Sequence, residues 1–296
     1  MKQESRAALA LVSPAIAVIA LVAIAPMVWT LWESLHLHDL RMPWLGQPFV
    51  GLDNYAAALG DARFRGALLH TGGFVLASVS LELALGLVFA LAMSRARRGR
   101  ALIRVVVLLS WAVPTVVAAL VWRFMFEGDS GIVPAALRAA GAIPPGFSFF
   151  VDPLAAWIPI VVADAWKMTP FVALLLLAGL ESIEPALYDA ARMDGAGPWR
   201  QFREITLPLL RPALLVAILF RALDAFRVFD VIYVLTGGGP GTSTEPIALY
   251  IFNTLLQHLR FGYGSALSVI VFLGTFVLAL AYIRLLGRSL LEERTA

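Results

Sequence analysis

Cysteine is absent from this chain of 296 residues, and lysine occurs only as Lys2 and Lys167. Without cysteine the chain can form neither a disulfide bond nor a thiolate metal site. A phosphate-binding loop needs a Gly-Lys pair followed by Ser or Thr, which neither lysine provides, so we expect no intrinsic ATPase. Charged residues are also scarce, at 15% against about 25% in a soluble domain.

Hydrophobic residues make up 60% of the chain and are gathered into runs of about 20 residues, which as helices span roughly 30 Å of hydrocarbon. This pattern predicts an all-α integral membrane protein with one transmembrane domain over residues 1–296. The six predicted spans cover residues 9–32, 68–93, 102–126, 154–180, 212–236 and 264–287. A cleavable signal peptide has an apolar core of about 7–15 residues, so the longer first run favours a retained helix.

Basic residues are distributed unevenly between the two sides of these spans. One side has 14 of them and the other has five, and cytoplasmic loops carry the excess. The richer side comprises Lys2, Arg6, Arg95, Arg97, Arg98, Arg100, Arg104, Arg192, Arg200, Arg203, Arg211, Arg284, Arg288 and Arg294. The sequence therefore predicts a multi-pass membrane protein with both termini and the loop at residues 182–211 on the cytoplasmic side.

The predicted cytoplasmic loop at residues 182–211 has the signals of a helix-turn-helix. Pro185 after Glu184 suits the first turn of a helix, and Gly195 suits its end. Pro198 can open a second short helix. We expect this loop to project from the membrane and to dock on another protein.

The same loop resembles the shared loop of ABC importer permeases, which reads Glu-Ala-Ala, three residues, Gly and then a spacer to Ile-x-Leu-Pro. The matching residues here are Asp189, Ala190, Ala191, Gly195, Ile205, Thr206, Leu207 and Pro208. Asp189 departs from the pattern, being one methylene shorter than glutamate. The resemblance implies that this coupling loop contacts a separate ATPase and that the Asp189 carboxylate meets a basic residue there.

A second set of motifs is similar to the larger permease of maltose- and trehalose-type carbohydrate importers. These motifs lie at residues 111–114, 166–170, 220–230 and 233–241. The resemblance implies ATP-driven sugar import by alternating access, with a disaccharide such as trehalose or maltose as substrate. It also implies a location in the bacterial inner membrane, no nucleic acid partner, and three kinds of protein partner besides the lipid bilayer: a second homologous permease, two ATPase subunits that bind ATP and Mg²⁺, and an extracytoplasmic sugar-binding protein. No cofactor is expected in this chain.

By alignment to that family, the sugar-contacting positions correspond to Trp111, Thr115, Met168, Phe171, Arg221, Asp224, Ala225 and Val228. Aromatic rings and a few charged groups suit a polyol. Arg221, Asp224, Arg227 and Asp230 also follow one another at i, i+3 steps, so they form either a self-neutralising ladder or, for the first two, sugar contacts as well. Asp164 and Lys167 have the same spacing, and Glu82 is interpreted as an isolated acid with a role in helix packing.

Several other functions remain as alternatives. The permease could take another solute of the family, such as glycerol 3-phosphate, a monosaccharide or an oligosaccharide. An ion-coupled secondary sugar transporter is less favoured, because such folds commonly show paired repeats and none is visible. A membrane enzyme is disfavoured because the sequence has no nucleophile motif, histidine cluster or paired carboxylates on a common edge.

Overall fold

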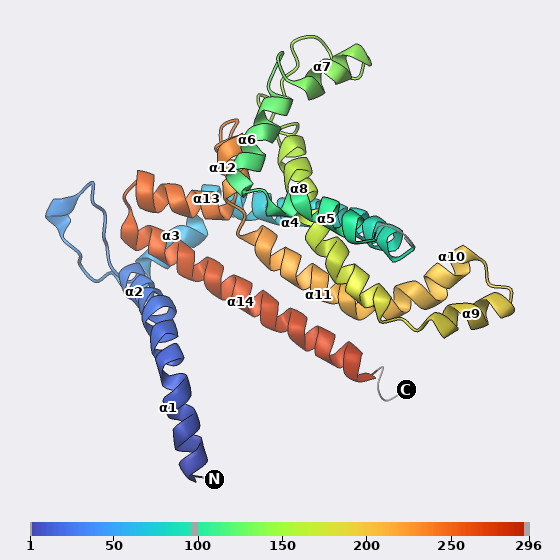
Figure 1. Cartoon of the computed structure of the whole chain (residues 1–296). Helices are drawn as coiled ribbons and strands as arrows, with labels where there is room; N and C mark the ends of the chain where they lie inside the picture. The colour runs from blue at the N-terminus through green and yellow to red at the C-terminus, as the bar shows by residue number, and fades with distance from the viewer. Residues whose placement is uncertain (1, 96–99, 293–296) are drawn as a thin grey trace. The chain divides into compact units, whose positions relative to one another are not determined.

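The computed structural model describes residues 2–95 and 100–292, so the predicted flanking residues Arg97, Arg98 and Arg294 lie outside the described residues. The described part is helical, with turns and two isolated β-bridges between helices (Figure 1). The helices are α1 (Lys2–Ile19), α2 (Ala25–Ser34), α3 (Asp53–Gly60), α4 (Ala62–Arg95), α5 (Arg100–Ala112), α6 (Thr115–Phe126), α7 (Ile132–Ala139), α8 (Trp157–Glu181), α9 (Pro185–Met193), α10 (Pro198–Gln201), α11 (Leu207–Phe226), α12 (Asp230–Leu235), α13 (Ile247–Phe252) and α14 (Phe261–Glu292).

The predicted all-α membrane fold is confirmed. Within residues 2–95 and 100–292, five helical segments are long and apolar enough to cross a membrane, and a sixth is formed if the bent pair α5 and α6 counts as one span. The five segments are Leu11–Ser34, Ala62–Arg95, Trp157–Glu181, Pro198–Phe226 and Phe261–Arg284. Four of the six predicted spans match one of these segments or differ from it by a few residues at either end.

The third predicted span, 102–126, is not one straight helix. Its halves α5 and α6 meet at an angle of 87°, which Figure 1 shows as a sharp turn between them. Pro114 lies at the break with an extended backbone (φ −54°, ψ 135°). Because proline has no N–H and disfavours helical geometry in the residue before it, α5 ends there and α6 starts again at Thr115.

The fifth predicted span, 212–236, is wrong at both ends. The helix starts much earlier, at Pro198, and ends at Phe226, so residues 227–229 separate α11 from the short helix α12. Phe229 has non-helical angles (φ −138°, ψ −64°), and Asp230 begins the next helix, where a carboxylate is favoured by the helix dipole. Consequently Arg227 and Asp230 do not face each other on one helix, and the predicted ladder stops at Arg227.

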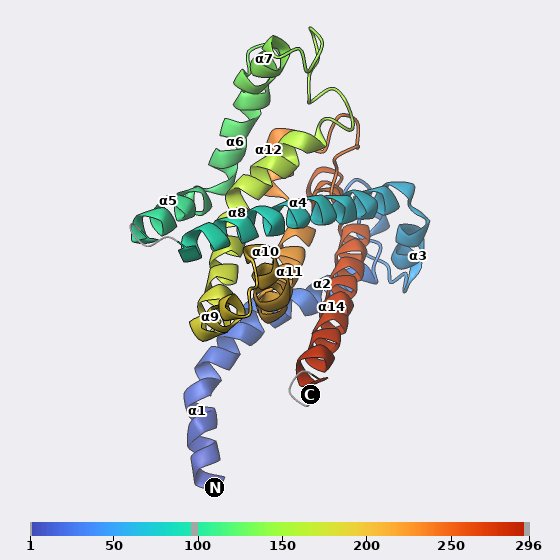
Figure 2. The same cartoon turned by 90° about the vertical axis from the view of Figure 1, so that its right-hand side faces the viewer.

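The coupling loop has the predicted helix-turn-helix form, with α9 and α10 making a hairpin at the ends of α8 and α11 (Figure 2). The helical chain continues through Pro208 and Pro212. A π-helical turn at Phe202–Thr206 precedes Pro208, and Pro212 lies inside α11. A widened turn relieves the missing N–H of the following proline, and the same arrangement recurs at Ala20–Ile24 before Pro26.

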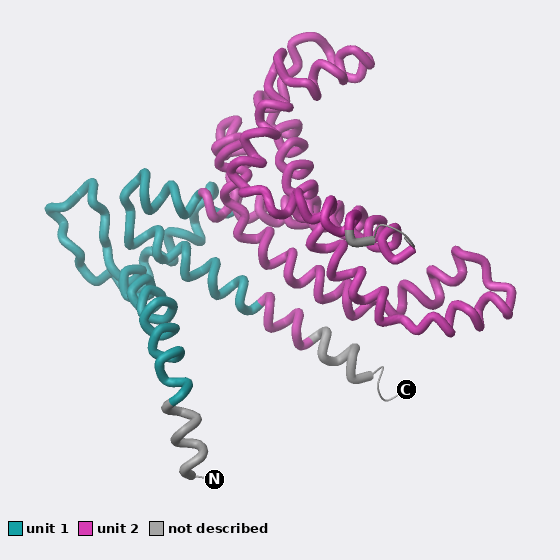
Figure 3. Tube along the Cα trace, viewed as in Figure 1, with its two compact units in different colours: residues 1–65, 250–277 teal, residues 66–249, 278–296 magenta. Residues whose placement is uncertain are grey.

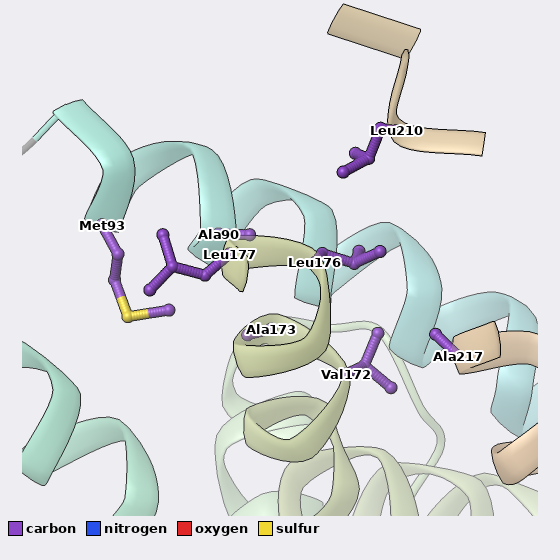
Figure 4. Packing of buried hydrophobic residues seen from close by; sticks show 8 residues of the cluster. All are labelled: Ala90, Met93, Val172, Ala173, Leu176, Leu177, Leu210 and Ala217. Carbon is purple, nitrogen blue, oxygen red and sulfur yellow. The ribbon is translucent and has the colours of Figure 1, made fainter. Parts of the chain in front are cut away.

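The chain divides into two compact units (Figure 3). The first comprises Met1–Arg65 and Tyr250–Val277, and the second comprises Gly66–Leu249 and Leu278–Ala296. We call them unit 1 and unit 2. In unit 2, α4, α8 and α11 share an apolar core (Figure 4). Its buried residues are Ala90, Met93, Val172, Ala173, Leu176, Leu177, Leu210 and Ala217.

Small residues allow the helices of this core to approach closely. A Cβ atom added to Gly86 of α4 would lie 2.6 Å from a methyl group of Val172, and one added to Gly179 of α8 would lie 2.6 Å from Cβ of Ala213. Lipid tails are as apolar as these side chains, so van der Waals packing rather than exclusion from water stabilises such contacts. This core holds together the three helices that carry the charged residues Glu82, Asp164 and Arg221.

Candidate functional site

A cavity of about 350 Å³ lies in unit 2, where the two broken spans meet α8. Its lining comes from α6, α8, α11, α12 and the segment that connects α11 to α12. The lining residues are Thr115 from α6, Asp164, Lys167 and Met168 from α8, Asp224 and Ala225 from α11, Arg227, Val228 and Phe229 from the connecting segment, and Asp230 and Val231 from α12. Discontinuous helices that line a cavity are typical of solute sites in transporters, because their free backbone groups and side chains can contact the solute.

Lys167 stabilises the bend that shapes one side of this cavity. Its ammonium donates hydrogen bonds to the carbonyl of Trp111, at 3.2 Å, and to that of Val113. These carbonyls lie at the end of α5, where the helix leaves them without backbone partners. A cation is also favoured at a helix C-terminus by the dipole. Lys167 therefore does not pair with Asp164, as their i, i+3 spacing had suggested, and instead supports the break at Pro114.

Arg221 of α11 is the centre of a buried charge cluster behind the cavity. Its side chain is 1% exposed. Its guanidinium donates to both carboxylate oxygens of Glu82 on α4, from Nε at 2.5 Å and from Nη2 at 2.7 Å. Nη2 also donates to Asp164 Oδ2 at 3.0 Å, and Nη1 to Asp224 Oδ2 at 2.5 Å. This arrangement ties α4, α8 and α11 together.

Glu82 is thus not the isolated acid that its sequence neighbourhood suggested. It is fully buried and pairs with a residue 139 positions away in the chain. Ser78, one helical turn before it, lies 2.9 Å from Glu82 Oε1 and 2.5 Å from Asp164 Oδ2. Nothing local in the sequence signals this pairing, although a buried arginine does require carboxylate partners of this kind.

Five of the eight sugar-contacting positions taken from the family line the cavity: Thr115, Met168, Asp224, Ala225 and Val228. Arg221 lies behind it. Trp111 and Phe171 stack on each other with ring centroids 6.4 Å apart and are outside the lining. The lining residues that sequence reasoning did not assign to the site are Asp164, Lys167, Arg227, Phe229, Asp230 and Val231.

In the coupling loop, α9 ends at Met193 and the turn places Gly195 at φ +76°, a conformation that favours glycine. Asp189 is exposed and pairs with Arg192 within the same helix. Ala190 is exposed, Ala191 is half-buried, and Leu207 and Pro208 begin α11. The side chains of Met193 and Trp199 are 89% and 72% exposed, so the loop presents apolar groups on its surface.

A hydrogen bond joins the first helix of the coupling loop to the turn that precedes α11. The Tyr188 hydroxyl on α9 lies 3.0 Å from the Thr206 hydroxyl, which belongs to the π-helical turn before α11. α11 runs from that turn to Asp224 at the cavity. A displacement of the loop can therefore be carried along one continuous helix to the candidate site.

Comparison with known proteins agrees with this architecture. Residues 82–290 match the family described as binding-protein-dependent transport system inner membrane component. The trehalose/maltose transport system permease protein MalF of Thermococcus litoralis is 42% identical over 95% of this chain and 92% of its own length. The trehalose transport system permease protein SugA of Mycobacterium tuberculosis is 39% identical over 97% and 90%.

A solved structure supports the fold separately. A chain of a bacterial ABC transporter involved in the import of the acidic polysaccharide alginate superimposes with a TM-score of 0.83, covering 97% of this chain and 96% of its own, at 23% identity. At that identity the likeness concerns the fold alone. The family match covers the cavity, the buried cluster and the coupling loop, and the chain belongs to the binding-protein-dependent transport system inner membrane component family, the permeases of ABC importers.

Proposed function

We propose that this chain is a permease subunit of an ATP-driven carbohydrate importer whose substrate is a disaccharide such as trehalose or maltose. The observation that carries the proposal is the 42% identity, over 95% of the chain, to a permease named for trehalose and maltose transport. The cavity is consistent with it. A volume of about 350 Å³ is within the usual range for small-ligand pockets, and carboxylates such as Asp224 can accept hydrogen bonds from sugar hydroxyls.

ATP hydrolysis is assigned to two separate ATPase subunits, which bind the nucleotide and Mg²⁺, and a second homologous permease completes the membrane part. The coupling loop, with Asp189, Ala190, Ala191 and Gly195, is the proposed docking element for one ATPase. Its exposed Met193 suits a protein cleft. Closure of the ATPases moves the loop, α11 transmits the motion, and the cavity opens alternately to the two sides of the membrane.

An extracytoplasmic sugar-binding protein delivers the substrate to the outer side. The 14 to five distribution of basic residues supports cytoplasmic termini in the bacterial inner membrane. Reporter fusions after Arg203 are expected to read cytoplasmic and fusions at Gly241 external. A cytoplasmic reading at Gly241 contradicts this orientation.

Uptake of labelled sugar tests the proposed substrate class. A strain that lacks this permease but keeps its partner subunits should lose high-affinity uptake of trehalose or maltose and regain it with the gene restored. Unlabelled glycerol 3-phosphate, monosaccharides and longer oligosaccharides serve as competitors. Stronger competition by one of these than by either disaccharide would reassign the substrate within the family.

A further inference from the structure

Glu82 has an unusual place relative to the candidate site. It lies on α4, which contributes no lining residue to the cavity, and it is fully buried. Yet its carboxylate takes two of the hydrogen bonds that the Arg221 guanidinium donates, at 2.5 and 2.7 Å. A two-point contact between a carboxylate and the planar guanidinium fixes the orientation of the fork as well as its position.

The remaining donors of the guanidinium point at two of the three carboxylates that line the cavity. Nη1 reaches Asp224 at 2.5 Å and Nη2 reaches Asp164 at 3.0 Å. Ser78 adds a contact of 2.5 Å to the same Asp164 oxygen and 2.9 Å to Glu82. Asp224 Oδ1 also accepts from Arg227 Nη2, at 3.4 Å. The direction in which Asp164 and Asp224 present their carboxylates to the cavity therefore depends in part on how Glu82 holds Arg221.

Charge neutralisation does not account for Glu82. Three carboxylates, those of Glu82, Asp164 and Asp224, contact the single guanidinium of Arg221. If Glu82 were neutral, Arg221 would still have two anionic partners. Since the cluster has more negative than positive groups, the third carboxylate adds desolvation cost, and its contribution has to be geometric.

We propose that Glu82 is a positioning residue of the sugar site, which acts through Arg221 to set the direction of the Asp164 and Asp224 carboxylates. This inference rests on the proposed function. Without the Glu82 anchor, the guanidinium turns further onto Asp164 and Asp224 and occupies oxygens that would otherwise accept from sugar hydroxyls. Sugar affinity and the ranking of sugars change as a result, while the chain still inserts and assembles.

The test measures uptake of labelled trehalose and maltose by cells with the full importer, as a function of sugar concentration. Two variants are compared: Glu82→Gln removes the charge at nearly constant size, and Glu82→Asp keeps the charge but shortens the reach. We expect both to raise the half-saturating sugar concentration by about tenfold, the effect of one lost hydrogen bond to a charged group. Maximal uptake per assembled permease should stay within about twofold of the wild-type value. A twofold change corresponds to less than half of the free energy that one hydrogen bond to a charged group contributes.

Glu33→Gln is the matched control. Glu33 is a buried carboxylate of unit 1 that pairs with His38 and is not a member of the cluster, so the variant makes the same chemical change at another buried acid. The half-saturating sugar concentration of the Glu33→Gln variant should equal that of wild type. Immunoblots of membranes should show equal amounts of all the variants.

Each other result overturns the inference. If Glu82→Asp has the same half-saturating sugar concentration as wild type, then only the charge of Glu82 matters, whatever the result for Glu82→Gln. Loss of both variants from the membrane would assign Glu82 to helix assembly alone. Failure of the proposed function is seen separately, because wild type itself would then show no saturable disaccharide uptake, and the inference would fall with it.

Discussion

Replacing Arg221 by methionine should destabilise the membrane domain more than any exposed charge substitution. The change keeps an unbranched side chain but removes four hydrogen bonds to carboxylates, at 2.5, 2.7, 3.0 and 2.5 Å. Glu82 and Asp164, at 0% and 13% exposure, then face each other without a cation. Breaking a buried pair by removing one partner costs about 3–5 kcal/mol, because the remaining charge is not solvated.

That cost is a large fraction of a marginal total stability of about 5–15 kcal/mol. We therefore expect Arg221→Met to lower both the yield of monodisperse protein and its melting temperature in detergent, followed by fluorescence size-exclusion chromatography. Arg221→Lys should lie between Arg221→Met and wild type, because one ammonium keeps the charge but cannot reproduce the fork.

The matched control for Arg221→Met is Arg200→Met, since Arg200 and Glu204 form an exposed i, i+4 pair with side chains 64% and 57% exposed. Such pairs contribute about 0–1 kcal/mol, so little change is expected. Equal effects of the two methionine variants would refute the reasoning, because they would show that burial of the cluster has no energetic consequence.

Three further predictions concern the cavity, the coupling loop and unit 1. Asp224→Asn should raise the half-saturating sugar concentration in uptake assays without lowering the amount of permease in the membrane, because Arg221 keeps two other carboxylates. Gly195→Leu should impair transport at normal membrane levels, since no atom lies within 4 Å of an added Cβ and the cost, about 1–2 kcal/mol, comes from φ +76° alone. Burial acts to raise the pKa of the Asp61 carboxyl, but hydrogen bonds from Tyr250, Tyr263 and two backbone N–H groups outweigh it and hold the pKa below its usual value. Asp61 thus stabilises the fold above its ordinary pKa and loses this effect as the pH falls through the lowered value, so Asp61→Asn should flatten the acid side of a plot of melting temperature against pH.

The sequence was sufficient for the features that depend on local chemistry. Long apolar runs predict the spans because only a helix satisfies its own backbone in lipid. Gly195 between Asp194 and Pro198 predicts the turn of the coupling loop, and the structure has that turn.

The sequence did not show which prolines break a helix. Pro114 ends α5, whereas Pro170 and Pro212 lie inside continuous helices. The difference is tertiary, because Lys167 of another helix satisfies the carbonyls at the end of α5. The break after Phe226 has neither proline nor glycine beside it.

The cluster around Arg221 was also beyond local reasoning. Intrahelical spacing paired Arg221 with Asp224 correctly, but the stronger two-point contact is with Glu82, on a helix 139 residues away in sequence. Residues at i, i+3 on one helix can be paired from sequence alone, whereas partners on different helices depend on how those helices pack.

The central claim, that this permease imports sugar with energy from separate ATPases, is tested most directly by ATP hydrolysis in proteoliposomes. The purified chain alone should hydrolyse no ATP. The assembled complex also contains the second permease, the two ATPase subunits and the sugar-binding protein. Its rate of ATP hydrolysis should rise with trehalose or maltose and with no unrelated solute. Hydrolysis by the chain alone, or an assembled complex whose ATPase rate no sugar alters, would contradict the account.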